Sequence, residues 1–204
     1  MSAPGCRLLG IVGAPASGKS TLTDTLVASL TTQGAPVSSV PMDGFHLSQR
    51  QLAALGRSER KGAPDTFDAH GYGALLQRIR SAHGTTEVVY APGFDRAIEE
   101  PIAASLAVSP DAALVITEGN YLLLPDGPWS SVAAMLDETW FLDVETSIRE
   151  AWLVERHQRF GRSEADAHAW MANTDRPNAQ RINATASSAN RHLLWDGDRI
   201  RFVD

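Results

Sequence analysis

The chain is poor in cysteine and lysine. Among its 204 residues there is one cysteine, Cys6, and the lysines are Lys19 and Lys61. A single cysteine excludes an internal disulfide and a cysteine-rich metal site. Lys and Arg form no run and the net charge is -6. Nucleic-acid-binding proteins usually carry a basic footprint, so we expect no nucleic-acid partner.

The chain also lacks long apolar runs. None approaches the length of about 20 residues that crosses a membrane. Residues 1–12 lack the charged start and long apolar stretch of a signal peptide. We therefore expect a cytoplasmic protein with no membrane partner, monomeric or homodimeric. The length fits one compact α/β domain over residues 1–204.

Short apolar runs alternate with helical patterns, which favours βα units and a parallel sheet. The run 112–117 (AALVIT) is apolar throughout, as a central parallel strand should be. Other strands are expected at 7–12, 36–41, 87–90, 138–142 and 199–203. Helices are expected at 20–33, 49–55, 72–81, 146–160, 163–172 and 181–193.

One motif stands between the first expected strand and the first expected helix. Residues 13–20 read GAPASGKS and fit G-x-x-x-x-G-K-[ST] at every defined position. In this phosphate loop, curled backbone N–H groups and a helix N-terminus face phosphate oxygens. Lys19 reaches the β- and γ-phosphates and the Ser20 hydroxyl can bind Mg²⁺. The predicted nucleotide contacts are Gly13, Ala14, Ala16, Ser17, Gly18, Lys19, Ser20 and Thr21.

Two carboxylates follow other expected strands. Asp43 comes after the strand at 36–41, and ligands of open parallel sheets sit beyond the carboxyl ends of the strands. Asp43 could accept the proton of an attacking hydroxyl, or it could belong to an ordinary Asp-Gly turn. Glu118 ends the apolar central strand, where P-loop proteins hold their metal. A solvated strand-end Glu is the alternative interpretation.

The ordered motifs resemble the P-loop kinase family of phosphoribulokinase, uridine kinase and bacterial-type pantothenate kinase. Similarity is strongest to bacterial sequences described as fructose transport-system kinases or nucleoside-kinase-like proteins. The matching segments span nearly the whole chain. They are 13–20, 41–47 (PMDGFHL), 60–68 (RKGAPDTFD), 90–96 (YAPGFDR), 117–124 (TEGNYLLL) and 175–179 (DRPNA).

The resemblance implies a three-layer α/β/α fold of P-loop NTPase type, with a mostly parallel central sheet and a helical lid over about residues 146–175. It implies that Asp43 is the catalytic base, that Lys19 binds phosphate, and that Ser20 and Glu118 hold Mg²⁺. It places Asn178 near the adenine of ATP. The implied substrate-binding residues are His46, Phe67, Asp68, Tyr90, Arg96 and Tyr121.

Arginines mark the expected lid helix. Arg149 and Arg156 are seven residues apart and share one helix face, whereas Arg159 drifts off it. Arginines on a closing lid can stabilise charge on the transferred phosphoryl group. A solvated charged face is the other interpretation. We assign Arg149 to nucleotide binding and Arg156 to catalysis.

These features together predict an ATP-dependent kinase that phosphorylates a hydroxyl of a small metabolite. The resemblance favours a sugar-like acceptor such as fructose. A nucleoside or pantothenate-like acceptor stays open, because the segment 90–101 matches neither set. A regulatory P-loop ATPase without an acceptor is the alternative of another class. A GTPase is disfavoured, because Lys61 lies in Arg-Lys-Gly and no N/T-K-x-D segment exists.

Overall fold

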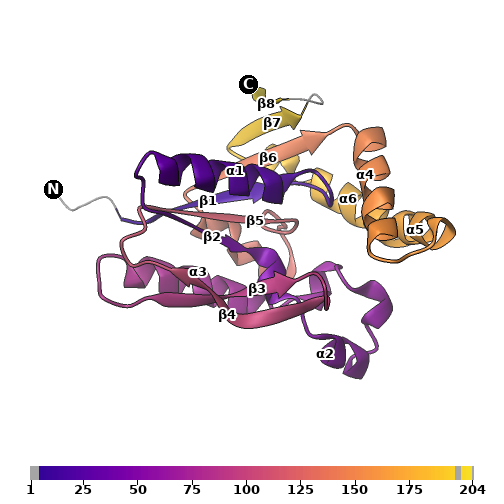
Figure 1. Cartoon of the computed structure of the whole chain (residues 1–204), viewed down its shortest axis with the longest axis horizontal. Coiled ribbons are helices and arrows are strands. Elements are labelled where there is room, and N and C mark those ends of the chain that lie inside the picture. Colours follow the sequence, from indigo (N-terminus) through magenta and orange to yellow (C-terminus); the bar gives the residue numbers. More distant parts are fainter. Residues whose placement is uncertain (1–4, 196–198, 204) are drawn as a thin grey trace.

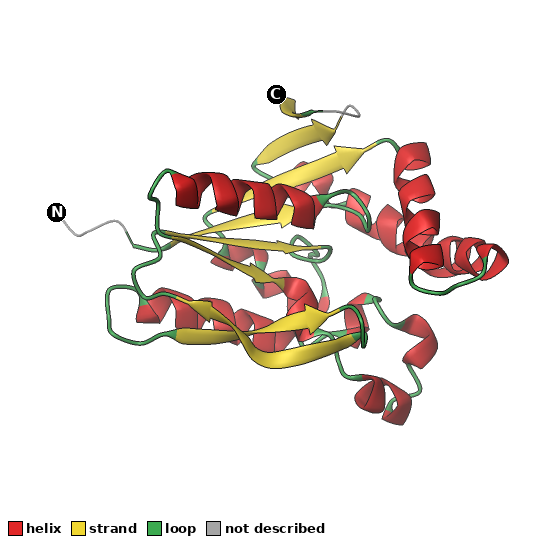
Figure 2. Ribbon diagram, in the orientation of Figure 1, coloured by secondary structure: helices red, strands yellow, loops and turns green. Residues whose placement is uncertain are grey.

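The computed structural model describes residues 5–195 and 199–203, and its centre is a six-stranded sheet (Figures 1 and 2). The strand order is β2-β5-β1-β6-β7-β8. Neighbouring strands run parallel except β8, which is antiparallel to β7. The bounds are β1 (Arg7–Val12), β2 (Val37–Pro41), β5 (Leu114–Gly119), β6 (Glu138–Val144), β7 (Arg191–Trp195) and β8 (Ile200–Val203).

Helices cover both faces of this sheet. Because side chains alternate along a strand, Leu9 and Ile11 of β1 pack against helix α1 (Lys19–Thr32). Its partly buried Leu22, Leu26 and Leu30 lie in this cluster, as their four-residue spacing predicted. Leu8 and Val12 face the opposite side. The predicted three-layer α/β/α fold with a mostly parallel sheet is confirmed.

The larger part of the core lies on the face away from α1. Helix α3 (Ala69–Ala82) contributes Tyr72 and Leu76, and helix α6 (Arg176–Asn183) contributes Ile182. Trp129, from the irregular segment between β5 and β6, is 2% exposed and joins the same cluster. This face is therefore thick, and it supports the strands whose ends carry the motifs.

The predicted helices at the start of the chain and at its centre are confirmed. Besides α1 and α3, they are α2 (Gln49–Ala54) and α4 (Thr146–Arg159). The helix expected at 163–172 is α5 (Glu164–Trp170), which continues through a π-helical turn, Met171–Asp175, into α6. None of the helices within the described residues has the length and apolarity to cross a membrane.

The prediction of a helix at 181–193 is wrong. Residues 181–183 end α6, and residues 191–193 belong to β7, which pairs with β6. The register places Phe141 beside His192 and Leu142 beside Leu193. Leu193 is 3% exposed. Burial against the open edge of the sheet thus decides the conformation of a segment whose local sequence also suits a helix.

The strand expected at 87–90 lies outside the central sheet. Strands β3 (Val89–Asp95) and β4 (Glu100–Val108) form a separate antiparallel hairpin. No strand was expected at β4, whose alanines and Pro101 are poor strand formers. Pairing with β3 holds this segment extended.

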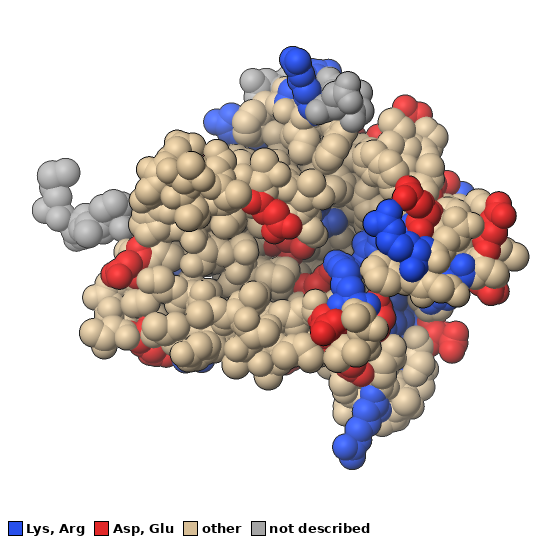
Figure 3. Space-filling model, viewed as in Figure 1, with Lys and Arg blue, Asp and Glu red and all other residues tan. Residues whose placement is uncertain are grey.

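The motifs meet where the parallel strands end. Figure 1 shows β1, β2 and β6 pointing toward the side of the molecule on which α2, α4 and α5 lie. The loop after β1 carries the phosphate motif, the turn after β2 carries Asp43, and α4 follows β6 directly. On the face that Figure 3 shows, most charged side chains gather on the side of α2, α4 and α5. The surface over α1 and the hairpin is mostly uncharged.

Candidate active site

The phosphate loop is closed by its own lysine. Ala16 and Gly18 have φ angles of 61° and 86°, which curl the backbone before α1 begins at Lys19. Lys19 is 7% exposed, and its Nζ donates a hydrogen bond to the carbonyl of Ala14 at 3.0 Å. A curled backbone that leads into a helix N-terminus is an arrangement that typically binds anions.

Ser20 and Glu118 lie side by side at the mouth of this loop. The Ser20 hydroxyl donates to Glu118 Oε1 at 2.9 Å. Glu118 lies on β5, and register pairs it with Ile11 of β1. A hydroxyl and a carboxylate this close are two of the hard oxygen ligands that Mg²⁺ accepts beside nucleotide phosphates. The donor set therefore fits a magnesium ion. Among the described residues there is no cluster of three metal-ligating side chains.

The buried charges at the loop oppose one another. Burial lowers the pKa of Lys19, and Glu118 and Asp43 partly offset this effect. Burial raises the pKa of Glu118, the Asp43 carboxylate adds to the rise, and Lys19 opposes it. Each charged group needs its partner, since isolated charges are costly inside a protein. A divalent cation would relieve the crowding of the two carboxylates.

Asp43 occupies a tightly constrained turn after β2. It lies in the 3₁₀ turn Met42–Phe45. A Cβ on Gly44 would lie 2.2 Å from the carbonyl oxygen of Pro92, so the turn can approach β3 only because residue 44 is glycine. His46 Nδ1 lies 2.8 Å from the carbonyl oxygen of Asp43. The backbone of Asp43 is thus fixed on both sides.

Arg96 reaches the same carboxylate from the hairpin. Its guanidinium donates to Asp43 Oδ2 at 3.1 Å. Beside this pair lies a row of three rings, with His46 between Phe67 and Phe94 at centroid separations of 4.0 and 4.7 Å. These four residues place one cation and three stacked rings beside Asp43.

Two arginines of α4, Arg149 and Arg156, lie on the side of the helix that meets the phosphate loop. Arg149 is 3% exposed, and its guanidinium donates to the carbonyl of Pro15 at 3.4 Å. Arg156 is partly buried. Burial and the neighbouring Arg96 lower its pKa, while Asp43 raises it. The two arginines share one helix face, as their spacing predicted, and Arg156 is near enough to Asp43 for the carboxylate to raise its pKa.

Three other predicted substrate contacts have structural roles of their own. Tyr90 is 56% exposed on the outer face of β3. Asp68 caps α3 by accepting a hydrogen bond from the backbone N–H of Gly71 at 2.8 Å. Tyr121 is fully buried and its hydroxyl donates to the Gly62 carbonyl at 2.5 Å. They lie at the surface, at a helix cap and in the core, and their part in substrate binding stays a prediction.

For two of the predicted nucleotide contacts, the described residues give no contact with the rest of the site. Thr21 is exposed on the first turn of α1, and Asn178 is partly buried on α6. Both stay predictions.

Sequence reasoning missed Trp195, which ends β7. A Cβ on Gly18 would lie 2.7 Å from Trp195 Cζ3, so the indole rests directly on the phosphate loop. The indole also meets Trp152 of α4 edge-on, with ring centroids 5.6 Å apart. The two tryptophans are separated from the loop by more than 130 positions, so no local signal could have indicated this contact.

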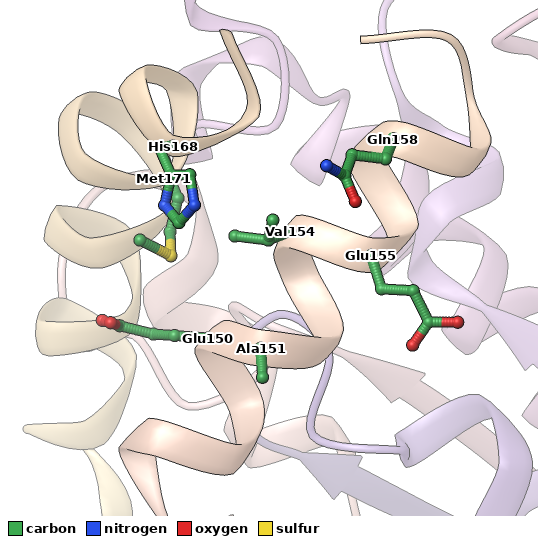
Figure 4. A pocket seen from close by; sticks show the side chains of 7 residues that line it. All are labelled: Glu150, Ala151, Val154, Glu155, Gln158, His168 and Met171. Atoms are coloured by element: carbon green, nitrogen blue, oxygen red, sulfur yellow. The ribbon is translucent and has the colours of Figure 1, made fainter. Parts of the chain in front are cut away.

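A separate groove lies on the other flank of α4. It holds about 350 Å³ and is lined by α4 and by residues of α5 and the π-helical turn (Figure 4). Val154 projects toward His168 and Met171 across it (Figure 4). Arg149 and Arg156 are not among its lining residues. The groove therefore does not belong to the phosphate site.

Comparison with known proteins agrees with this geometry. No family model matches the chain. It is 44% identical over 125 residues to "ATP-dependent kinase-like protein notR'" of Aspergillus versicolor, and the match covers 59% of this chain and 73% of that protein. It is 36% identical over 175 residues to "Putative uridine kinase C227.14" of Schizosaccharomyces pombe, which covers 83% of this chain and 73% of that protein. The chain belongs to the phosphoribulokinase/uridine kinase family of P-loop kinases.

A solved structure places the family's fold over nearly the whole chain. The crystal structure named "putative fructose transport system kinase" from Silicibacter sp. TM1040 superposes with a TM-score of 0.85 at 40% identity. The match covers 95% of this chain and 91% of that one. Two of the relatives are named as an ATP-dependent kinase or a kinase-like protein, which agrees with an ATP-dependent kinase of this family.

Proposed function

We propose that this protein transfers the γ-phosphoryl group of ATP to a hydroxyl of a sugar-like metabolite, with Mg²⁺ as cofactor. One observation carries the proposal. Three adjacent strand ends carry Asp43, Lys19 and the Ser20–Glu118 pair. The charge of Asp43 is close enough to raise the pKa of both Lys19 and Glu118, and Ser20 donates a hydrogen bond to Glu118. A phosphate site and a candidate general base at one sheet edge make the two halves of a phosphotransfer site.

The donor half consists of the loop, Lys19 and the metal pair. Lys19 would neutralise the β- and γ-phosphates, and Ser20 and Glu118 would hold Mg²⁺. The ion would supply charge neutralisation as the transferred group departs. The lid, residues 146–175, would bring Arg156 to the developing charge and exclude water when it closes.

The acceptor half is centred on Asp43. Its carboxylate would accept the proton of the attacking hydroxyl while Arg96 holds it in place. The ring row of Phe67, His46 and Phe94 would bound the pocket. The fructose preference rests on similarity to the Silicibacter protein, whose name carries that word. A nucleoside or a pantothenate-like compound is the alternative acceptor.

We further propose that residues 1–204 form one kinase domain that acts in the cytoplasm, where ATP is available. A regulatory ATPase without an acceptor would need the loop and the metal pair only. The Asp43–Arg96 pair and the adjoining rings favour the kinase.

Turnover with a panel of acceptors tests the proposal. ADP release from MgATP would be measured with fructose and related sugars, nucleosides and pantothenate, each against a water control. We expect one class to raise ADP release well above the control. If every acceptor leaves the rate at the water background, the kinase function is refuted and an ATPase is favoured.

A further inference from the structure

We propose that Trp195 is a nucleotide-positioning residue, whose indole N–H donates a hydrogen bond to the nucleoside part of the bound nucleotide. The inference rests on the proposed function for the direction in which ATP lies. Its observations are the position of Trp195 on the sheet, its contact with Gly18, and an unpaired buried N–H.

Strand order fixes where the nucleoside lies. The phosphate loop follows β1, and Asp43 follows β2, on one side of β1 in the order β2-β5-β1-β6-β7-β8. The γ-phosphate must face Asp43 for the acceptor hydroxyl to attack it. The rest of the nucleotide then extends to the other side of β1, over the ends of β6 and β7. Trp195 is the last residue of β7, paired with Val144 at the end of β6.

The indole touches the loop that would hold the phosphates. Gly18 has a φ of 86°, and a Cβ there would lie 2.7 Å from Trp195 Cζ3 and 3.1 Å from Cε3. The six-membered part of the ring therefore covers Gly18, directly before Lys19. A group seated there adjoins the phosphates on the side away from Asp43.

Helix α4 places a second aromatic ring against Trp195. Arg149, Trp152 and Arg156 are spaced by three and four residues, so they share the inward face of α4. Trp152 meets Trp195 edge-on, and Arg149 donates to the carbonyl of Pro15. Two aromatic rings thus stand together beside the phosphate loop, both on the β6–β7 side.

The indole N–H of Trp195 is one of four buried side-chain polar atoms that lack a partner among the described residues. Trp195 Nε1 is buried and has no hydrogen-bond partner among the residues that the structure describes. Buried donors are almost always paired, because an unmade hydrogen bond is costly. By contrast, Trp140 Nε1 donates to Glu138 Oε1 at 2.7 Å. A purine nitrogen or a ribose oxygen at this position would satisfy the Trp195 donor.

The test separates nucleoside contacts from support of the loop. Trp195→Phe keeps an aromatic six-membered ring against Gly18 and removes the N–H. Calorimetry would measure its affinity for ADP and for tripolyphosphate, which has phosphates and no nucleoside. We expect ADP to bind about 3- to 10-fold more weakly, the worth of one hydrogen bond, and tripolyphosphate to bind as in the wild type. Trp140→Phe is the matched control and should change neither affinity.

Two outcomes overturn the inference. Equal weakening of ADP and tripolyphosphate would show that Trp195 only supports the loop, and an unchanged ADP affinity would show that it does not contact the nucleoside. In the wild-type protein, an indole N–H resonance should move with ADP and stay with tripolyphosphate. If no indole resonance responds differently to ADP and to tripolyphosphate, the inference fails. Because this measurement uses the wild-type protein, it applies even if Trp195→Phe does not fold. Absence of acceptor phosphorylation with intact ADP binding would refute the proposed function alone.

Discussion

Arg96 binds the carboxylate of Asp43 across a gap of 53 sequence positions, with 3.1 Å between the guanidinium nitrogen and Oδ2. The pair joins the turn after β2 to the end of the β3–β4 hairpin. Its side chains are 38% and 25% exposed, so the carboxylate is reachable from solvent yet held in one orientation. A general base needs both properties, because it must meet a substrate proton in a defined geometry.

The first prediction replaces this carboxylate. Asp43→Asn keeps an oxygen that Arg96 can bind but removes the proton acceptor. We expect acceptor phosphorylation to slow by about 10²–10⁴-fold, the usual worth of a general base, with ADP affinity unchanged. Steady-state rates and calorimetry would measure the two effects. Asp65→Asn, which alters another arginine-paired aspartate, should keep the wild-type rate. Loss of ADP binding in Asp43→Asn would instead indicate a structural role.

The second prediction concerns the glycine that positions Asp43. Gly44→Ala would place a Cβ 2.2 Å from the Pro92 carbonyl oxygen, so the turn or the hairpin must move. We expect a loss of about 1–3 kcal/mol in the free energy of unfolding, together with slower turnover. Urea titration measures the first and steady-state kinetics the second.

A matched glycine provides the control for this change. A Cβ on Gly73, within α3, would meet only the Met135 side chain, at 3.4 Å. Gly73→Ala should therefore preserve turnover and raise stability by about 0.5–1 kcal/mol through helix propensity. Equal behaviour of the two variants would contradict the proposed constraint on the turn.

The third prediction follows from the raised pKa of Glu118. Burial, and then Asp43, favour the protonated form in the folded state. Its contribution to stability is therefore complete below the unfolded pKa of 4.5 and is lost as pH rises toward the higher folded pKa. Without metal or nucleotide, Glu118→Gln should gain in melting temperature relative to the wild type across that window, while its MgATP turnover falls.

Melting curves at a series of pH values would measure this difference. Glu87→Gln removes a 55% exposed carboxylate at the surface and should follow the wild-type curve. A Glu118→Gln protein that becomes less stable than the wild type as pH rises would contradict the sign.

The fourth prediction distinguishes the arginines of α4. Arg156→Gln should lower kcat by about 10³-fold or more if its charge stabilises the transferred phosphoryl group. Arg159→Gln removes a 71% exposed side chain that pairs with Glu155, and should act like the wild type. Single-turnover rates at saturating ATP would compare them. Similar rates for both variants would show that Arg156 belongs to a solvated charged face of α4 and has no part in catalysis.

Local patterns in the sequence indicated the candidate residues that directly follow a strand. The motif at 13–20 specifies its own loop, and Asp43 and Glu118 follow strands whose carboxyl ends must share an edge. The direction of a side chain was harder to predict. Tyr90 and Arg96 belong to the same matched segment, yet one faces outward and the other binds Asp43.

Long-range packing explains what the patterns missed. The segment at 191–195 becomes a strand because β6 has an open edge, and β4 is extended because β3 pairs with it. Trp195 meets Gly18 only after the whole sheet has formed. Contacts of this kind depend on elements far apart in the chain, so a local window cannot contain them.

The strand order has a consequence for kinetics. Because the phosphate loop stands between the β2 side and the β6–β7 side, the proposed function puts the acceptor and the nucleoside part of ATP at different places along the sheet edge. Neither would need to leave before the other arrives. Direct transfer within a ternary complex then follows, and double-reciprocal plots of rate against the two substrates should intersect rather than run parallel.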